Sequence, residues 1–269
     1  MKKVLAIALI LALVIFAPGC GILFLGDGWN LNNYTGVWSG TYDFTAGHLM
    51  VAGSNGSIMV EVWDRDEVRA DAHWTAKTDV YQFFPEVEES DGILSLKLPS
   101  DRELSGVSWT VQVPQGLDVT ARTSNGRITM LGDGYGAVTA DTSNGRVVLE
   151  GSGQDLLYVN TSNGSVDVAR WTGEEVDITT SNGSITAHLG KIDKGMYSLS
   201  SSNGSIRVFV QEDSAFDLSA STSNGRINSE LGGSWSPDIS GKAYNGAYNG
   251  GGARLVLRTS NSNIWLHRP

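Results

Sequence analysis

The chain has 269 residues, a formal net charge of −10 and 41% apolar residues, with 33 glycines but only 6 prolines. This composition is typical of a packed fold and excludes a disordered or collagen-like chain. The acidic excess, without any long run of Lys or Arg, argues against a nucleic-acid partner and against electrostatic docking onto anionic lipid.

Residues 1–19 are typical of an export signal. Two lysines precede a run of 13 apolar residues, Val4 to Phe16, and a short stretch of small residues then leads to Cys20. This stretch resembles the lipobox of bacterial lipoproteins, which implies cleavage before Cys20 and attachment of lipid to it. Two other interpretations stay open: an uncleaved membrane anchor, interrupted by Pro18 to Gly21, and a buried structural cysteine. Because Cys20 is the only cysteine, the chain can form no intrachain disulfide.

Residues 20–33, rich in Gly and Asn, are interpreted as a tether between the lipid anchor and a folded body that spans residues 34–269. The first part of this body, to about residue 116, is irregular. Its alternating apolar segments, Ile93 to Leu98 and Trp109 to Val113, predict strands that end at a proline. The polar stretch from Arg65 to Ser90 predicts a longer excursion before them.

A Ser-Asn-Gly tripeptide recurs about every twenty residues. From the second copy onward, three successive spacings are 19 residues and the next two are 21. A fixed period of this size is the signature of a solenoid, in which each repeat is stabilised by its neighbours. The repeated asparagines are Asn55, Asn125, Asn144, Asn163, Asn182, Asn203 and Asn224, and a Ser-Asn-Ser copy contributes Asn261.

Apolar residues occupy alternate positions on both sides of each turn, six and four residues before the asparagine and three and five after it. Alternation of period two predicts two short, half-buried strands per repeat, with polar residues on the outward face. The sequence therefore predicts an all-β, single-chain β-helix with coils of about 19–21 residues. Regular coils span residues 117–231, and a loop and a terminal coil span residues 232–269.

Asn and Gly both reach positive φ at low cost, so the Asn-Gly pair predicts a tight backbone bend at every turn. In a stack, equivalent residues of adjacent coils lie about 4.8 Å apart. We therefore expect inward asparagine amides to form a hydrogen-bonded ladder, and we expect Asn163→Leu to destabilise the fold by a few kcal/mol. The alternative is a row of exposed amides that binds sugar or metal.

The stretch from Tyr244 to Gly252 is interpreted as a glycine-rich tyrosine loop. A degenerate coil is the alternative, since Asn245 lies 21 residues after Asn224. Tyr244, Tyr248 and the outward-parity Trp171 are candidate contacts for a partner, because exposed aromatic rings stack on sugars and on proteins. The other interpretation is that these rings cap coil ends or pack beneath loops.

No catalytic residues are assigned. Asp141 and Asp177 come nearest to a carboxylate pair, yet strand geometry places them roughly 12 Å apart, beyond the separation used by glycosidases. The four histidines lack ligand spacing, and neither a phosphate-binding loop nor a nucleophile elbow occurs. The sequence therefore predicts no enzyme activity, no cofactor and no metal site. An enzyme site within residues 63–116 is the alternative.

The Thr-Ser-Asn-Gly-x-Ile repeat, preceded by the stretch from Val111 to Val119, resembles the bacterial putative-adhesin family of β-strand-repeat domains, also called Toastrack. The resemblance covers about residues 46–266. It implies a right-handed β-helix on an exported or membrane-anchored protein, with no catalytic residues to carry over. The departure, Ser262 in place of Gly, is interpreted as the mark of a capping coil.

Together these features predict a non-enzymatic lipoprotein, lipid-anchored through Cys20 to the bacterial cell envelope, on the periplasmic or cell-surface face of the outer membrane. Its solenoid would present a surface for adhesion or for binding an envelope protein or a glycan. A structural or envelope-stress scaffold is one alternative, and a β-helix polysaccharide lyase or hydrolase is another. The sequence identifies neither the ligand nor the binding face.

Overall fold

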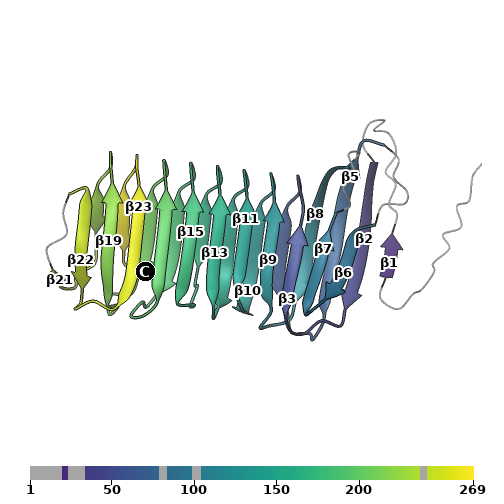
Figure 1. Ribbon diagram of the computed structural model, residues 1–269, viewed down its shortest axis with the longest axis horizontal. Coiled ribbons are helices and arrows are strands. Elements are labelled where there is room, and N and C mark those ends of the chain that lie inside the picture. The colour runs from purple at the N-terminus through teal and green to yellow at the C-terminus, as the bar shows by residue number, and fades with distance from the viewer. Residues whose placement is uncertain (1–19, 24–33, 79–83, 99–103, 237–240) are drawn as a thin grey trace, which may run out of the picture.

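The computed structural model describes residues 20–23, 34–78, 84–98, 104–236 and 241–269. The regular secondary structure of these residues consists of β-strands alone. The strands form two 12-stranded sheets that enclose the core of a long solenoid (Figure 1). The predicted all-β solenoid is therefore confirmed. Among the described residues, no helix has the length and apolar character needed to cross a membrane.

The two sheets, A and B, run side by side along the solenoid. Sheet A contains, in spatial order, β1 (Cys20–Leu23), β2 (Tyr34–Tyr42), β5 (Val68–Ala76), β8 (Leu104–Val113), β4 (Ile58–Val62), β10 (Ile128–Tyr135), β12 (Val147–Gly153), β14 (Val166–Ala169), β16 (Ile185–Gly190), β18 (Ile206–Val210), β24 (Ile264–His267) and β20 (Ile227–Ser229). From the same end, sheet B contains β6 (Glu86–Ser90), β7 (Ile93–Lys97), β3 (His48–Ala52), β9 (Asp118–Thr123), β11 (Val138–Thr142), β13 (Leu156–Thr161), β15 (Glu175–Thr180), β17 (Met196–Ser201), β23 (Ala253–Thr259), β19 (Phe216–Thr222), β22 (Ala243–Tyr248) and β21 (Trp235–Ser236).

Five regular coils, from β9–β10 to β17–β18, form the middle of the solenoid. Each coil places one strand in sheet B, turns through Ser-Asn-Gly and places the next strand in sheet A. Neighbouring coils pair in parallel and in register, so that Val138 lies between Val119 and Leu157. All three side chains are buried in the core. Each aliphatic side chain buried in this way contributes about 1.5–3 kcal/mol, so the stacking of coils supplies most of the stability.

At both ends the coils do not stack in chain order. Strand β3 pairs with β7 on one side and β9 on the other, so the coil β7–β8 lies outside the earlier coil β3–β4. At the opposite end β23 pairs with both β17 and β19, which places the last coil of the sequence one slot inside the stack. The expectation that Ser262 marks a capping coil is therefore wrong, because its coil lies between two others.

Within residues 63–116, predicted to be irregular, those that the structure describes contribute the two strands of one coil and part of an end cap. Strand β5 runs antiparallel to β8, and β2 runs antiparallel to β5, which extends sheet A beyond the last coil. The indole rings of Trp38 and Trp109 meet edge to face at 6.1 Å over Ala72, which pairs with both residues. These aromatic rings close the N-terminal end of the core.

The C-terminal end is closed by β22, which runs antiparallel to β19. The prediction of a loop from Tyr244 onward is therefore wrong over Tyr244–Tyr248, and a degenerate parallel coil does not form there either. The ring of Tyr248 packs against Phe216 at 5.0 Å and against Trp235 at 4.7 Å. An antiparallel strand and an aromatic cluster thus cover the final coil, as they do at the other end.

The segment interpreted as a tether begins with a strand. Cys20 to Leu23 pair antiparallel with β2, and the backbone of Cys20 lies opposite Gly40. This strand is the outermost of sheet A, at the end of the solenoid farthest from β21 and β22 (Figure 1). The proposed signal peptide and residues 24–33 of the tether lie outside the described residues.

Candidate functional site

The Ser-Asn-Gly turns line up along one edge of the solenoid and carry a continuous ladder of asparagine amides. Except at Asn55, each Nδ2 donates to the Oδ1 of the asparagine in the next coil of the stack toward its N-terminal end, at 2.6–2.7 Å. In spatial order the ladder contains Asn55, Asn125, Asn144, Asn163, Asn182, Asn203, Asn261 and Asn224. All of these side chains are exposed. The expectation that they point inward is therefore wrong, because the turn presents them to solvent.

The glycine of each turn is required by packing between coils. Neither the asparagine nor the glycine of any Ser-Asn-Gly turn has positive φ, so the predicted reason for the pair is wrong. A Cβ atom added to Gly164 would lie 1.7 Å from the carbonyl oxygen of Gly145 in the coil before it. The same contact recurs at 1.7–1.9 Å for Gly126, Gly145, Gly183, Gly204 and Gly225. At these glycines the stacked backbones approach too closely for a Cβ atom without a local shift, and only the displaced coil has a larger residue, Ser262, at the equivalent position.

The threonine of the motif holds the buried side of the same turn. The Thr161 hydroxyl donates to the Gly145 carbonyl oxygen at 3.2 Å and accepts from the Gly164 N–H at 3.1 Å. Thr142, Thr180, Ser201 and Thr222 make equivalent pairs of bonds. Each hydroxyl thus satisfies two buried backbone groups, one in its own coil and one in the neighbour. The Thr-Ser-Asn-Gly motif as a whole joins coil to coil.

The ladder has a direction along the solenoid. Every amide donates toward the N-terminal end, where Asn55 Nδ2 reaches the Ser105 carbonyl oxygen at 3.2 Å. The turn backbone follows the same direction, since the Asn163 N–H donates to the Ser143 carbonyl oxygen at 3.0 Å. At the accepting end, the last such carbonyl, that of Ser223, receives the Lys242 Nζ at 2.9 Å. A cation therefore caps the negative end of a row of aligned dipoles.

Beside this end of the ladder, the outer face of sheet B is hollowed. The cavity has a volume of about 410 Å³ and lies where β17, β23 and β19 run into their turns. Its lining consists of Ser200, Ser201, Ser202, Ser221, Thr222, Ser223, Lys242, Ala243, Arg258, Thr259 and Ser260. We call this cavity the serine hollow. Its lining contains two cations and no acidic side chain, on a chain whose formal net charge is −10.

Arg258 lies between two serines in the serine hollow. Its neighbours in register are Ser200 on β17 and Ser221 on β19. Its side chain is exposed and takes part in none of the ion pairs found among the described residues. Because serine is short, the two flanking side chains leave free space on both sides of the guanidinium group.

A second surface feature lies on the outer face of sheet A, where aromatic rings stack across adjacent strands. His188 on β16 stacks on Phe209 on β18 at 4.1 Å, and Phe209 stacks on His267 on β24 at 4.8 Å. The His267 Nδ1 lies 2.9 Å from the Glu230 carboxylate. Because the rings cover one another's faces, this row mainly reinforces the pairing of three strands.

The Toastrack DUF4097 profile matches residues 54–252, which is most of the chain. The chain belongs to the Toastrack DUF4097 family. The predicted resemblance is therefore confirmed, and it extends to the fold described above.

Several solved structures are similar to this Toastrack chain. A putative adhesin from Bacteroides fragilis shares 12% identity over 86% of this chain and 97% of its own, with a TM-score of 0.47. A putative cell adhesion protein from Clostridium sporogenes shares 10% identity over 88% of this chain and 100% of its own, with a TM-score of 0.38. A putative lipid binding protein from Parabacteroides distasonis shares 13% identity over 88% and 97% of the two chains, with a TM-score of 0.36. No curated protein matches the chain significantly.

The aromatic residues expected to contact a partner are buried. Tyr244 is 6% exposed, Tyr248 is 0% exposed and Trp171 is 1% exposed. The two tyrosines belong to the cluster that closes the C-terminal end, and Trp171 packs directly over Gly153. The prediction that these rings contact a partner directly is therefore wrong. The alternative interpretation, that the rings cap coil ends, fits both tyrosines.

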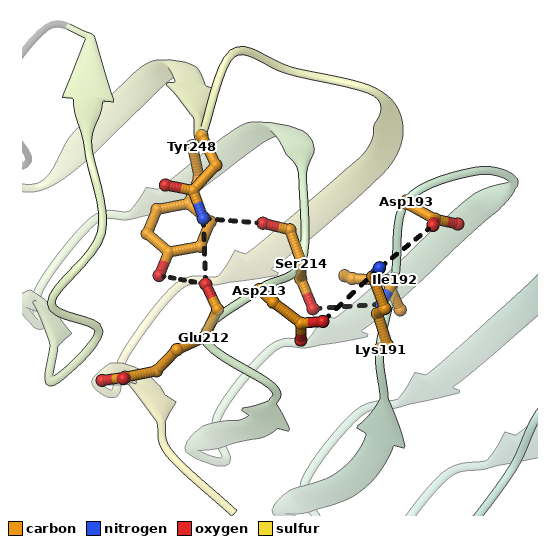
Figure 2. A network of polar contacts seen from close by, with 8 residues as sticks. Lys191, Ile192, Asp193, Glu212, Asp213, Ser214 and Tyr248 are labelled. Atoms are coloured by element: carbon orange, nitrogen blue, oxygen red, sulfur yellow. Dashed lines mark hydrogen bonds and ion pairs between the residues drawn. The ribbon is translucent and has the colours of Figure 1, made fainter.

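Polar contacts fix the end cap to the opposite edge of the solenoid (Figure 2). The Tyr248 hydroxyl donates to the Glu212 carbonyl oxygen at 3.0 Å, and Asn249 Nδ2 donates to the carbonyl oxygens of Glu212 and Ser214 at 2.9 Å. Lys191 lies 3.4 Å from Asp213 in the same turn. These contacts hold the turn between β18 and β19, where the chain skips the position in the stack that the last coil, β23–β24, occupies. Their role is therefore structural.

The most perturbed carboxyl group on the outer face of sheet B is Asp177. Partial burial raises its pKa, and the like charge of Glu175, two residues earlier on the same face of β15, raises the pKa further. Burial also raises the pKa of Tyr197 to about 12. Among the described residues, no group of three or more His, Cys, Asp or Glu side chains is placed to hold a metal ion.

Sequence reasoning missed the serine hollow. In the order of the sequence, Ser200 and Ser221 are neighbours and Arg258 belongs to the last repeat. The available signal was the long spacing of 37 residues between Asn224 and Asn261, which allows a displaced coil. It does not say which slot that coil fills.

Proposed function

We propose that this Toastrack chain is a non-enzymatic, lipid-anchored protein of the bacterial cell envelope, whose solenoid holds a binding surface away from the membrane. The observation that carries the proposal is the separation of two features along the long axis. Strand β1, which begins at Cys20, lies at one end, and strands β23 and β19 lie near the other (Figure 1). Residues of these two strands line the serine hollow. An anchor at Cys20 would leave the hollow free to meet a glycan or an envelope protein.

The construction of the solenoid supports this role. Successive coils are joined by strand pairing, by a surface ladder of amides and by buried threonine hydroxyls. Each hydrogen bond contributes only about 0.5–1.5 kcal/mol, but the set repeats in every coil and fixes the register along the whole length. Within residues 63–116, the alternative place for an enzyme site, the described residues contribute strands to a coil and to an end cap.

The anchor is tested by comparing the full-length wild type with Cys20→Ser in a bacterial host. We expect the wild type to fractionate with membranes, to begin at Cys20 and to carry acyl groups on it by mass spectrometry, and we expect the variant to carry no acyl group. An unmodified Cys20 in the wild type, or acyl groups on the variant, would contradict the anchor.

The binding role is tested separately with full-length protein in detergent micelles, applied to a glycan array and to immobilised envelope proteins. We expect saturable binding to at least one of them. If folded protein, identified by its β-sheet signal in circular dichroism, bound neither the glycans nor the envelope proteins, a binding role would be contradicted. A structural or envelope-stress scaffold would then be favoured.

A further inference from the structure

We propose that the serine hollow binds an acidic saccharide, with the guanidinium group of Arg258 contacting a sugar carboxylate. Such a saccharide would be the ligand of the surface that the solenoid holds away from the membrane, so the proposal rests on the proposed function.

The first argument is charge. Two other outward arginines of sheet B have an acidic residue beside them in register, Asp141 beside Arg122 and Asp217 beside Arg254. None of the ion pairs found among the described residues joins these neighbours. Arg258 has a serine on each side, and its site lacks any acidic lining residue. A guanidinium group presents a planar fork of N–H donors that matches a carboxylate, and such bonds are about twice as strong as neutral ones. Because neither register neighbour of Arg258 is acidic, its guanidinium group is available to a carboxylate of a ligand.

The second argument is the floor of hydroxyl groups. Ser200, Ser221, Ser202, Ser260 and Ser223 line the hollow around Arg258. Adjacent strands place equivalent residues about 4.8 Å apart, which applies to Ser202, Ser260 and Ser223, whereas Ser200 and Ser221 lie on either side of Arg258. Each hydroxyl can both donate and accept a hydrogen bond. A sugar ring offers hydroxyls of the same dual character at comparable spacing. This floor distinguishes a saccharide from a bare inorganic anion, which needs donors only.

The third argument is size and electrostatic context. The hollow has a volume of about 410 Å³ and is open to solvent rather than enclosed. The Lys242 Nζ spends one N–H on the Ser223 carbonyl oxygen and keeps two others for the ligand. Two cations in the lining suit one or two carboxylates.

The test uses full-length protein in detergent micelles and isothermal titration calorimetry. The probe is a hyaluronan hexasaccharide, and its control is the same hexasaccharide with each glucuronic acid reduced to glucose. The first variant is Arg258→Gln. The matched control is Arg122→Gln, which removes another exposed arginine from the equivalent position of β9, several coils away.

We expect the wild type to bind the acidic probe at least tenfold more tightly than the reduced probe. We expect Arg258→Gln to weaken binding of the acidic probe at least tenfold and Arg122→Gln to leave it within twofold, with the thermal midpoint of both variants unchanged. Sodium sulfate, compared with sodium chloride at equal ionic strength, should not displace the saccharide.

Equal binding of the two probes, an equal loss in both arginine variants, full displacement by sulfate, or no binding of the acidic probe would each overturn the proposal. Its failure is distinguishable from failure of the proposed function. Acylation of Cys20 and binding to other glycans or envelope proteins would persist if only the assignment of the serine hollow were wrong.

Discussion

The middle and the ends of this solenoid solve the same packing problem in different ways. In the middle, each coil stacks on the one before it in the chain. At both ends, a coil from elsewhere in the sequence takes a slot between two others. The comparison shows that one local motif can be used with two chain orders, because Ser-Asn-Gly requires only some neighbouring coil and does not specify which one.

The displaced C-terminal coil also creates the candidate site. Because β23 lies between β17 and β19, Arg258 comes to lie between Ser200 and Ser221. A solenoid stacked in chain order would place the two serines together, and no cation would stand between them. The displacement of the last coil and the serine hollow therefore occur at the same place in this molecule.

Both ends also need closure that the middle does not need. An open coil would expose unpaired backbone groups and an apolar core, which invites pairing with other chains. Strands β2 and β5 at one end and β22 at the other provide antiparallel covers. The different threading therefore serves to terminate the stack.

The difference between the middle and the C-terminal end should be largest in two deletion variants. Removing residues 163–181 takes out 19 residues, one regular coil, and joins Ser162 to Asn182. We expect a shortened but folded solenoid, because Asn182 then stacks on Asn144. Removing residues 253–269 takes out 17 residues and empties the slot between β17 and β19.

For the second deletion we expect loss of order over β19 to β22, measured as rapid hydrogen exchange and protease cleavage there, with the middle coils protected. Similar protection patterns in the two deletions would contradict the distinction between the middle and the ends.

The next largest effect concerns the backbone contact between coils. Gly164→Ala places a Cβ 1.7 Å from a carbonyl oxygen, so we expect a loss of about 3 kcal/mol or more in the free energy of unfolding by urea. The matched control is Gly53→Ala in the first turn. There the nearest atom to an added Cβ is 3.7 Å away, and we expect a change within about 1 kcal/mol. Equal losses would mean that the stacked glycines are not limited by close approach.

The sequence was sufficient for the middle of the molecule and insufficient for the ends. Alternation around each asparagine identified the buried rows, such as Val119, Val138 and Leu157, because inward apolar side chains report strand register directly. The slot taken by β23 left no such trace, since its repeat has the same pattern wherever it stacks. Tyr248 was misjudged for a related reason: its antiparallel pairing with β19 is a long-range contact that composition does not reveal.

A smaller effect separates ladder positions in the middle from those at the end. Asn163 makes two ladder bonds and Asn224 makes one. Since the amides are exposed, water can satisfy the partners that a substitution frees. We expect Asn163→Ala to lose about 1–2 kcal/mol and Asn224→Ala about half as much, by urea unfolding. A loss above about 4 kcal/mol in Asn163→Ala would indicate the buried ladder that the sequence predicted.

The smallest expected effect is electrostatic and belongs to a middle coil. Because the folded-state pKa of Asp177 is raised above its ordinary value of 3.8, the native state holds this proton more tightly than the unfolded chain. Stability therefore falls as pH rises from the unfolded pKa through the folded pKa, and the loss is complete above the folded value. We expect Asp177→Asn to raise stability at pH 7 by less than about 0.5 kcal/mol, since the carboxyl group is only partly buried.

That gain should disappear at about pH 3, where Asp177 is protonated in both states. The matched variant Glu175→Gln removes the like charge and leaves the burial, so it should recover only part of the gain. Thermal midpoints of the three proteins between these pH values measure the effect. A difference between Asp177→Asn and the wild type that is independent of pH would show that the substitution acts through packing against Tyr158 and Ser198, its neighbours in register, rather than through charge.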